Sequence, residues 1–238
     1  MKRHRRRRRG HPQRNRLRRK LSRPSLRPAG LTGPASDAEW RRLAAATSLA
    51  ELIGRHVDDL TAIAIDDIGW LGNLSMPDGW RQWRTPDGLV RLAVYGPRPG
   101  GGWEATDTVS VFACTGTLPE TLSHNADTML RQLSATGVRA YPLDTPAIPG
   151  VAAIRASGYI AVAGRSLWAR FNTYAAGSAE PGRGRLVQHS SFVDAARFLR
   201  LGADIATLTD GVQQGFWSSI DAATTPTPAH DNSPPPAP

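Results

Sequence analysis

The thiol and imidazole side chains are the first place to look for catalysis in this sequence. Its single cysteine, Cys114, would need a base such as His124 or His189 beside it in a partly open, electropositive site. Cys114 instead ends an apolar run, so we expect a small buried filler. Ser123, His124 and Asp127 have the types of a hydrolytic triad but would share one helix, without a G-x-S-x-G motif. We therefore predict no enzyme, and a hydrolase is the least favoured function.

Metal and cofactor chemistry also lack a pattern. None of the six histidines has a second histidine at the spacing of a zinc pair. The acidic pairs 58–59 and 66–67 lack the alternating oxygen ligands of a calcium loop. The glycine run at 100–102 is not followed by the Lys-Ser/Thr of a phosphate-binding loop. The sequence predicts neither metal nor cofactor.

Tryptophans and arginines gather in the middle of the chain. These residue types are enriched at binding surfaces because they are stiff and amphipathic. They are equally suited to fill the core of a sheet that has no disulfide, and both interpretations stay open. The candidate ligand-binding residues are Trp80, Trp83, Arg84 and Trp103.

The N-terminal region is strongly basic. Residues 1–30 hold 14 of the 30 Lys and Arg and no acid, which leaves 16 basic and 20 acidic residues in the remaining 208. Neutralising phosphates with such a segment gives salt-dependent, sequence-independent affinity for nucleic acid or anionic lipid. The alternative is a solvated tail or a misassigned start. The candidate polyanion-binding residues are Arg5, Arg6, Arg7, Arg8, Arg9, Arg14, Arg16, Arg18 and Arg19.

The elements that must position these residues follow from apolar periodicity. Residues 1–36 have the composition of a disordered tail. Residues 37–62 form an amphipathic helical segment, in which the helical pattern reaches Leu60 and Ser48 and Glu51 have the spacing of a capping box. No stretch is long and apolar enough to span a membrane, and no apolar core of a signal peptide is present.

The best-specified unit is a strand followed by a helix. The β-branched run from Thr108 to Cys114 predicts the strand. Thr117 and Glu120 have capping-box spacing, and Gly137 follows the last periodic residue, so we expect a helix between them.

Strands dominate the rest of the chain. Four candidates follow closely, without a helix between them, and must pair antiparallel: 151–162, 167–175, 186–193 and 198–205. A last helix would begin at Asp210 and carry Val212, Phe216 and Ile220 on one face. The proline-rich residues 223–238 are an extended tail. The predicted fold class over residues 63–222 is α+β, an antiparallel β-sheet meander packed by helices.

This order of elements resembles a known family. The turn Pro77-Asp78-Gly79-Trp80, the Tyr95-Gly96 strand end, the strand at 109–113, the meander and the C-terminal helix are similar to the actinobacterial LpqN/LpqT lipoprotein family. The resemblance covers roughly residues 70–222 and implies a Mog1/PsbP-like α/β/α sandwich. It also implies a non-catalytic, envelope-associated binding domain, with no catalytic residues to transfer. Members usually carry a lipoprotein signal where this chain has its arginine-rich segment.

Two function hypotheses follow. In the first, the chain is a non-enzymatic binding or adaptor domain that contacts a protein or a small envelope ligand through the sheet face that one crossing helix leaves free. It would then lie in the cell envelope or be secreted, as the family resemblance implies. In the second, it is a cytoplasmic polyanion-binding protein that uses the arginine-rich tail, in keeping with the lack of a signal peptide.

Overall fold

The structure is a computed structural model that describes residue 46 and residues 48–98, 102–117, 122, 124–162 and 164–224, with the backbone alone over 221–224. Residues 1–36 and the tail beyond 224 lie outside this part. The elements in chain order are α2 (Leu49–Ile53), β1 (Asp58–Ile63), η1 (Ile65–Asp67), α3 (Gly69–Gly72), β2 (Trp80–Arg84), β3 (Val90–Pro97), β4 (Trp103–Thr115), α5 (Thr128–Gln132), β5 (Thr136–Pro142), β6 (Val151–Val162), β7 (Arg165–Ala176), β8 (Gly184–Asp194), η2 (Ala195–Arg197) and α6 (Phe198–Thr224).

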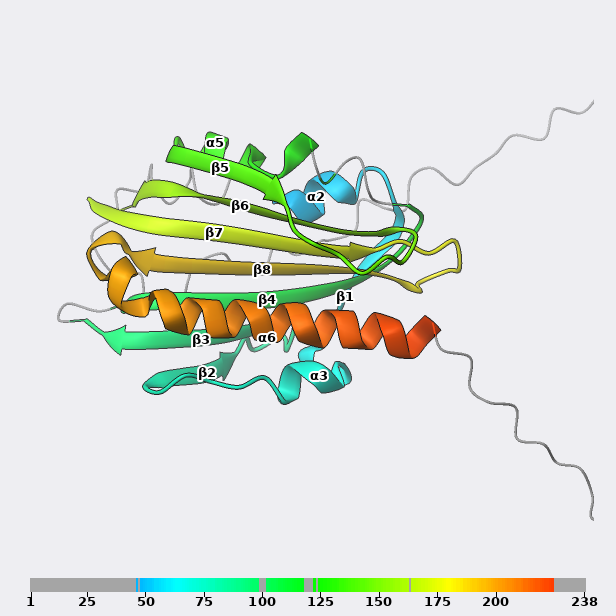
Figure 1. Cartoon of the computed structure of the whole chain (residues 1–238), viewed down its shortest axis with the longest axis horizontal. Coiled ribbons are helices and arrows are strands. Elements are labelled where there is room, and N and C mark those ends of the chain that lie inside the picture. Colours follow the sequence, from blue (N-terminus) through cyan, green and yellow to red (C-terminus); the bar gives the residue numbers. More distant parts are fainter. Residues whose placement is uncertain are drawn as a thin grey trace, which may run out of the picture.

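The described strands form one eight-stranded sheet in the order β2-β3-β4-β8-β7-β6-β5, with β1 paired to β4 beside this path (Figure 1). Every pairing is antiparallel. The meander β6-β7-β8 is confirmed, and the turn between α3 and β2 has the expected glycine, Gly79, at φ 80°. The α+β class is therefore confirmed.

Helices cover both faces of the sheet. On one face α6 runs lengthwise along the sheet, in front of β3 and β4 in Figure 1, and contacts β7 and β8. Its Val212 and Phe216 pack against Val109 and Val187. On the other face α2 and α5 pack against alternate residues of β4, β6, β7 and β8, such as Leu186. This is an α/β/α arrangement. The expectation that one whole face stays free is wrong, because the short helices α2 and α5 cover part of it.

The N-terminal helical segment is shorter than the sequence predicts. The capping box is confirmed, since Glu51 N–H donates to Ser48 Oγ and Ser48 N–H donates to a Glu51 carboxylate oxygen, each at 3.2 Å. The helix nevertheless ends at Ile53. Residues 58–63 form β1 instead, because pairing with β4 supplies the backbone hydrogen bonds that a longer helix would otherwise make.

The helix expected between Thr117 and Gly137 is interrupted. Leu122, His124 and Asn125 are helical, a turn follows at 126–127, and α5 then spans Thr128–Gln132; Glu120 of the expected capping box lies outside the described residues. The left-handed turn after α5 is made by Ser134 at φ 55°. Gly137, at φ 61°, lies in β5 where that strand shifts register against β6. Gly137 is therefore a bulge residue and not a helix cap.

The last helix begins twelve residues before the predicted start, so the strand expected over 198–205 is wrong. Leu201, Ile205 and Leu208 are buried at helical spacing, whereas Leu199 is 94% exposed. Asp194 accepts a hydrogen bond from Ala196 N–H and so caps the short turn that leads into α6. None of the described helices, α6 included, is apolar over the length that a bilayer crossing needs.

Candidate functional site

A layer of polar residues lies between the sheet and α6. Two rows of paired residues cross neighbouring strands, and because paired residues share a face, both rows point toward α6. The first row is Arg91, Val109, His189, Asn172 and Arg155. The second row is Ala93, Asp107, Ser191, Arg170 and Ser157.

Asp107 is the centre of this polar layer. Its Oδ2 atom accepts hydrogen bonds from His189 Nε2 at 2.6 Å and from Ser191 Oγ at 2.8 Å, and all three residues are fully buried. Asn172 Oδ1 accepts from Arg155 Nε at 2.7 Å, so the Asn172 amide N–H faces His189 Nδ1, at 3.1 Å. The hydrogen-bond chain therefore runs from Asp107 through the imidazole and the amide to Arg155, with the His189 proton on Nε2.

This arrangement does not build a serine nucleophile. The hydroxyl of Ser191 donates to the Asp107 carboxylate, whereas a nucleophilic serine must donate to the histidine that takes its proton. Cys114 is fully buried on the opposite face of the sheet, among the residues that pack under α2 and α5. Burial raises the pKa of its thiol, which keeps it protonated and unreactive at neutral pH.

Arg91 is the least satisfied member of the polar layer. Its side chain is 0% exposed, and Nη1 lies 4.0 Å from Asp107 Oδ1, beyond hydrogen-bond distance. All three guanidinium nitrogens lack a hydrogen-bond partner. Burial lowers the pKa of Arg91, and the charge of Asp107 opposes that shift. A buried pair of this kind is tolerated because each charge offsets part of the desolvation cost of the other.

Beyond the edge of α6 the same face opens. We call its surface over β5 and β6 the open face; Figure 1 places these strands to one side of α6. Tyr141 is 45% exposed and Tyr159 is 40% exposed, and Arg139 is exposed between them. β5 and β6 carry Arg139 and Arg155 on this face, Arg170 of β7 lies at its border, and β5, β6 and β7 contain no Asp or Glu. The open face is therefore aromatic and basic.

Arg170 and Arg155 lie where the open face meets α6. The Arg170 guanidinium stacks on Trp168, 4.5 Å from the ring centroid, and its Nη1 donates to Thr209 of α6 at 3.2 Å. Burial lowers the pKa of Arg170, and the positive charge of Arg155 lowers it further. The hydroxyl of Tyr174, a buried residue of the same strand, has no hydrogen-bond partner.

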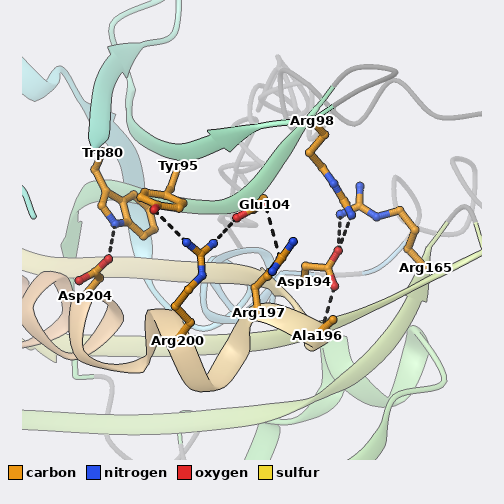
Figure 2. Close-up of polar contacts among 10 residues, drawn as sticks. All are labelled: Trp80, Tyr95, Arg98, Glu104, Arg165, Asp194, Ala196, Arg197, Arg200 and Asp204. Atoms are coloured by element: carbon orange, nitrogen blue, oxygen red, sulfur yellow. Dashed lines mark hydrogen bonds and ion pairs between the residues drawn. The ribbon is translucent and has the colours of Figure 1, made fainter. Parts of the chain in front are cut away.

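A cluster of ion pairs fastens the start of α6 to the sheet (Figure 2). Trp80 Nε1 donates to Asp204 at 3.0 Å, and Arg200 of α6 lies over the Tyr95 ring and pairs with Glu104 of β4. Arg98 and Arg165 both pair with Asp194, the residue that caps the turn before α6. These contacts set the position of α6 and with it the border of the open face.

The four predicted ligand-binding residues do not form one cluster. Trp80 is buried under α6, whereas Trp83 is 54% exposed on the opposite face of β2. Arg84 pairs with Asp66, and Trp103 is half-buried at the start of β4. Their ligand-binding role stays a prediction. The polyanion-binding arginines Arg5 to Arg19 lie outside the described residues.

The polar layer and the open face were not predicted from the sequence. Inward positions of β7 and β8 carry Arg170, Asn172, His189 and Ser191 where alternation calls for apolar residues, and that departure was the available signal. Among the described residues, no group of three or more His, Cys, Asp or Glu side chains could hold a metal ion.

Comparison with known proteins bears on the fold. No protein-family model matches this chain, and no curated protein matches it. Among solved structures, LpqN of Mycobacterium tuberculosis, described as involved in cell envelope biogenesis, matches with a TM-score of 0.50 at 17% identity. The match covers 68% of this chain and 94% of that one. At this identity the likeness extends to the fold: the chain is distantly LpqN-like in structure.

Proposed function

We propose that this protein is a non-enzymatic binding domain of the cell envelope, and that it contacts its ligand or protein partner through the open face. The envelope assignment is supported by the LpqN-like fold alone, since LpqN is described as involved in cell envelope biogenesis. The contact surface is supported by the structure of this chain.

The observation that carries the proposal is the exposure of aromatic side chains on a regular sheet. Tyr141 is 45% exposed and Tyr159 is 40% exposed, although other side chains of the same sheet a few residues away are buried. Stiff aromatic rings beside arginines, held by a rigid sheet, form a surface suited to binding because little side-chain freedom is lost on contact. The buried Asp107 network lies behind this surface and holds Arg155 through Asn172.

Amide hydrogen exchange on the full-length protein tests the proposal. The protein is incubated with a detergent extract of the native host's envelope, and exchange is followed by mass spectrometry. We expect protection over residues 136–162, where the open face lies, and loss of that protection in Tyr141→Ala/Tyr159→Ala. Trp83→Ala, on the opposite face, is the matched control and should leave the protection unchanged.

The opposite pattern would overturn the assignment. If the extract protects β2 and the protection disappears in Trp83→Ala but survives in the tyrosine variant, the contact surface is the one that the tryptophans predict. If no segment is protected by envelope extract, and the protein is found in the cytosol, the envelope proposal fails.

A second function is supported by the composition of the N-terminal region. The 14 basic residues and the absence of acids in residues 1–30 suit a polyanion. Under this alternative, nucleic acid binds the tail and the open face plays no part. Binding that vanishes when residues 1–36 are deleted would support it.

A further inference from the structure

We propose that Arg155 and Arg170, with the hydroxyl of Tyr174, bind the phosphate group of a small molecule at the border between the open face and α6. The inference rests on the proposed function, because it names the ligand class of the open face. These three residues belong neither to the predicted ligand-binding residues nor to the arginine-rich tail.

Charge is the first argument. Arg155 and Arg170 lie on adjacent strands, diagonal to one another across β6 and β7, and the positive charge of Arg155 lowers the pKa of Arg170. Within the described residues neither guanidinium has a carboxylate within ion-pair distance. An anion bound between them converts this repulsion into two attractive contacts.

Unused hydrogen-bond donors are the second argument. Arg170 Nε and the Tyr174 hydroxyl are buried and have no hydrogen-bond partner, although buried polar groups are nearly always paired. Tyr174 is 0% exposed, and burial raises its pKa, so the phenol stays protonated and can donate. A phosphate offers several acceptor oxygens to a planar guanidinium and a phenol at once.

Both guanidinium groups are already held in position. Arg170 stacks on Trp168 and donates to Thr209, while Arg155 donates to Asn172. Asn172 is fixed in turn by His189 and Asp107. Because little side-chain freedom remains to be lost, this arrangement favours binding. The buried network thus orients a binding group, which accounts for a charged layer in the middle of the sheet.

The surroundings favour a small molecule over a membrane. An α-helix is about 10 Å across, so α6 stands well above the sheet beside these residues and keeps a flat bilayer away from the buried Tyr174 hydroxyl. The exposed rings of Tyr141 and Tyr159 lie on the open side of the pair and can contact the remainder of the ligand.

Phosphate titration of the ¹⁵N-labelled full-length protein tests the inference. Sodium phosphate replaces chloride at constant ionic strength. The readout is the amide signals of β6 and β7, so that phosphate bound by the arginine-rich N-terminal region is not counted. We expect saturable shifts confined to these strands, and the same pattern with glycerol 3-phosphate. Arg155→Gln and Arg170→Gln should weaken binding at least about tenfold, and Tyr174→Phe about fivefold.

The controls separate this site from other causes. Arg81→Gln removes an exposed arginine from the opposite face of β2 and should leave the affinity unchanged. Equal shifts in Arg81→Gln, Arg170→Gln and the unchanged protein would mean an adventitious ion only and would overturn the inference. Perturbation of β6 and β7 by phosphatidylglycerol vesicles, without an effect of free phosphate, would overturn the small-molecule assignment.

The outcome is also distinct from that of the envelope experiment. Protection of the open face by envelope extract without phosphate binding would overturn the ligand class and leave the binding role in place. Phosphate binding at Arg155 and Arg170 without any protection by the extract would overturn the envelope role and leave this site standing.

Discussion

His189 Nε2 lies 2.6 Å from Asp107 Oδ2, and both side chains are fully buried in the middle of the sheet. The pair sits at the head of the hydrogen-bond chain that holds Arg155 at the border of the open face. A buried carboxylate at this point is costly unless every oxygen is compensated, so the pair is retained at the expense of stability. The pair costs stability, but it also helps to hold the Arg155 side chain in position.

Asp107→Asn should destabilise the protein strongly. The change leaves Arg91 as a buried charge without its carboxylate, and we expect a loss of about 3 kcal/mol in the free energy of unfolding. Ser191→Ala, which removes only a hydroxyl, should cost about 1 kcal/mol. Urea unfolding measures both, with the exposed Asp67→Asn as the control that changes stability by less than about 0.5 kcal/mol. Similar small effects for all three would contradict the described network.

Two glycines of α6 should respond in opposite directions to alanine. A Cβ atom at Gly215 would lie 2.4 Å from the Trp70 ring, whereas one at Gly202 meets nothing within 4 Å. We therefore expect Gly215→Ala to destabilise by about 1–3 kcal/mol through overpacking. Gly202→Ala should stabilise by about 0.5–1 kcal/mol through helix propensity. Thermal unfolding of the two variants checks the packing of α6 on α3, and equal shifts would contradict it.

Trp80 and Trp83 should differ in stability and in binding. Trp80→Phe removes the hydrogen bond to Asp204 and should cost about 1–2 kcal/mol, and a double-mutant cycle with Asp204→Ala should show coupling of at least about 0.5 kcal/mol. Trp83→Ala should cost less than about 1 kcal/mol, because the side chain is 54% exposed. Additive effects of Trp80→Phe and Asp204→Ala would contradict the hydrogen bond that joins α6 to β2.

Alkaline pH should destabilise the fold through Tyr174. Burial raises its folded-state pKa above the unfolded value of about 10, so its contribution is fully present below that pH and is lost as the pH rises above it. Between about pH 8 and about pH 11 the stability of Tyr174→Phe should therefore fall by about 1 kcal/mol less than that of the unchanged protein. Chemical unfolding at the two pH values measures the difference, and identical losses would contradict a buried phenol.

Deletion of residues 1–36 separates the two proposed functions. If the tail alone binds polyanions, duplex DNA binding disappears in the deletion variant, and in the full-length protein it weakens steeply with salt. The partner captured by the open face should still bind the variant. Loss of both interactions on deletion would contradict a binding role of the open face. Filter binding over a range of salt concentrations provides the measurement.

The sequence was sufficient for elements whose pattern is local. The limits of β6, Val151–Val162, agree with the prediction, and so does the capping box of Ser48 and Glu51, because alternation and caps depend on neighbours along the chain. The start of α6 was missed because Phe198 to Ile205 contains apolar residues at spacings that suit a strand as well as a helix. Packing against the sheet decides between the two.

The candidate site depended on information that is not local. Asp107, His189 and Asn172 come together only through the register of β4, β8 and β7, and Asp107 and His189 are 82 residues apart in the chain. Trp80 was chosen by its type as a ligand-binding candidate, which stays a prediction, and its type did not reveal that the indole donates to Asp204 of a distant helix. Local sequence patterns do not specify strand register or the pairing of distant segments.

Site-specific photo-cross-linking in the native host tests whether the protein contacts an envelope component through the open face. A photoreactive amino acid replaces Tyr159 on the open face in one strain and Trp83 on the opposite face in another, and envelope fractions are analysed after irradiation. We predict a light-dependent adduct from position 159 in the envelope and none from position 83. An adduct from position 83 alone would contradict contact through the open face, and recovery of the irradiated protein only in the cytosol would contradict a role in the envelope.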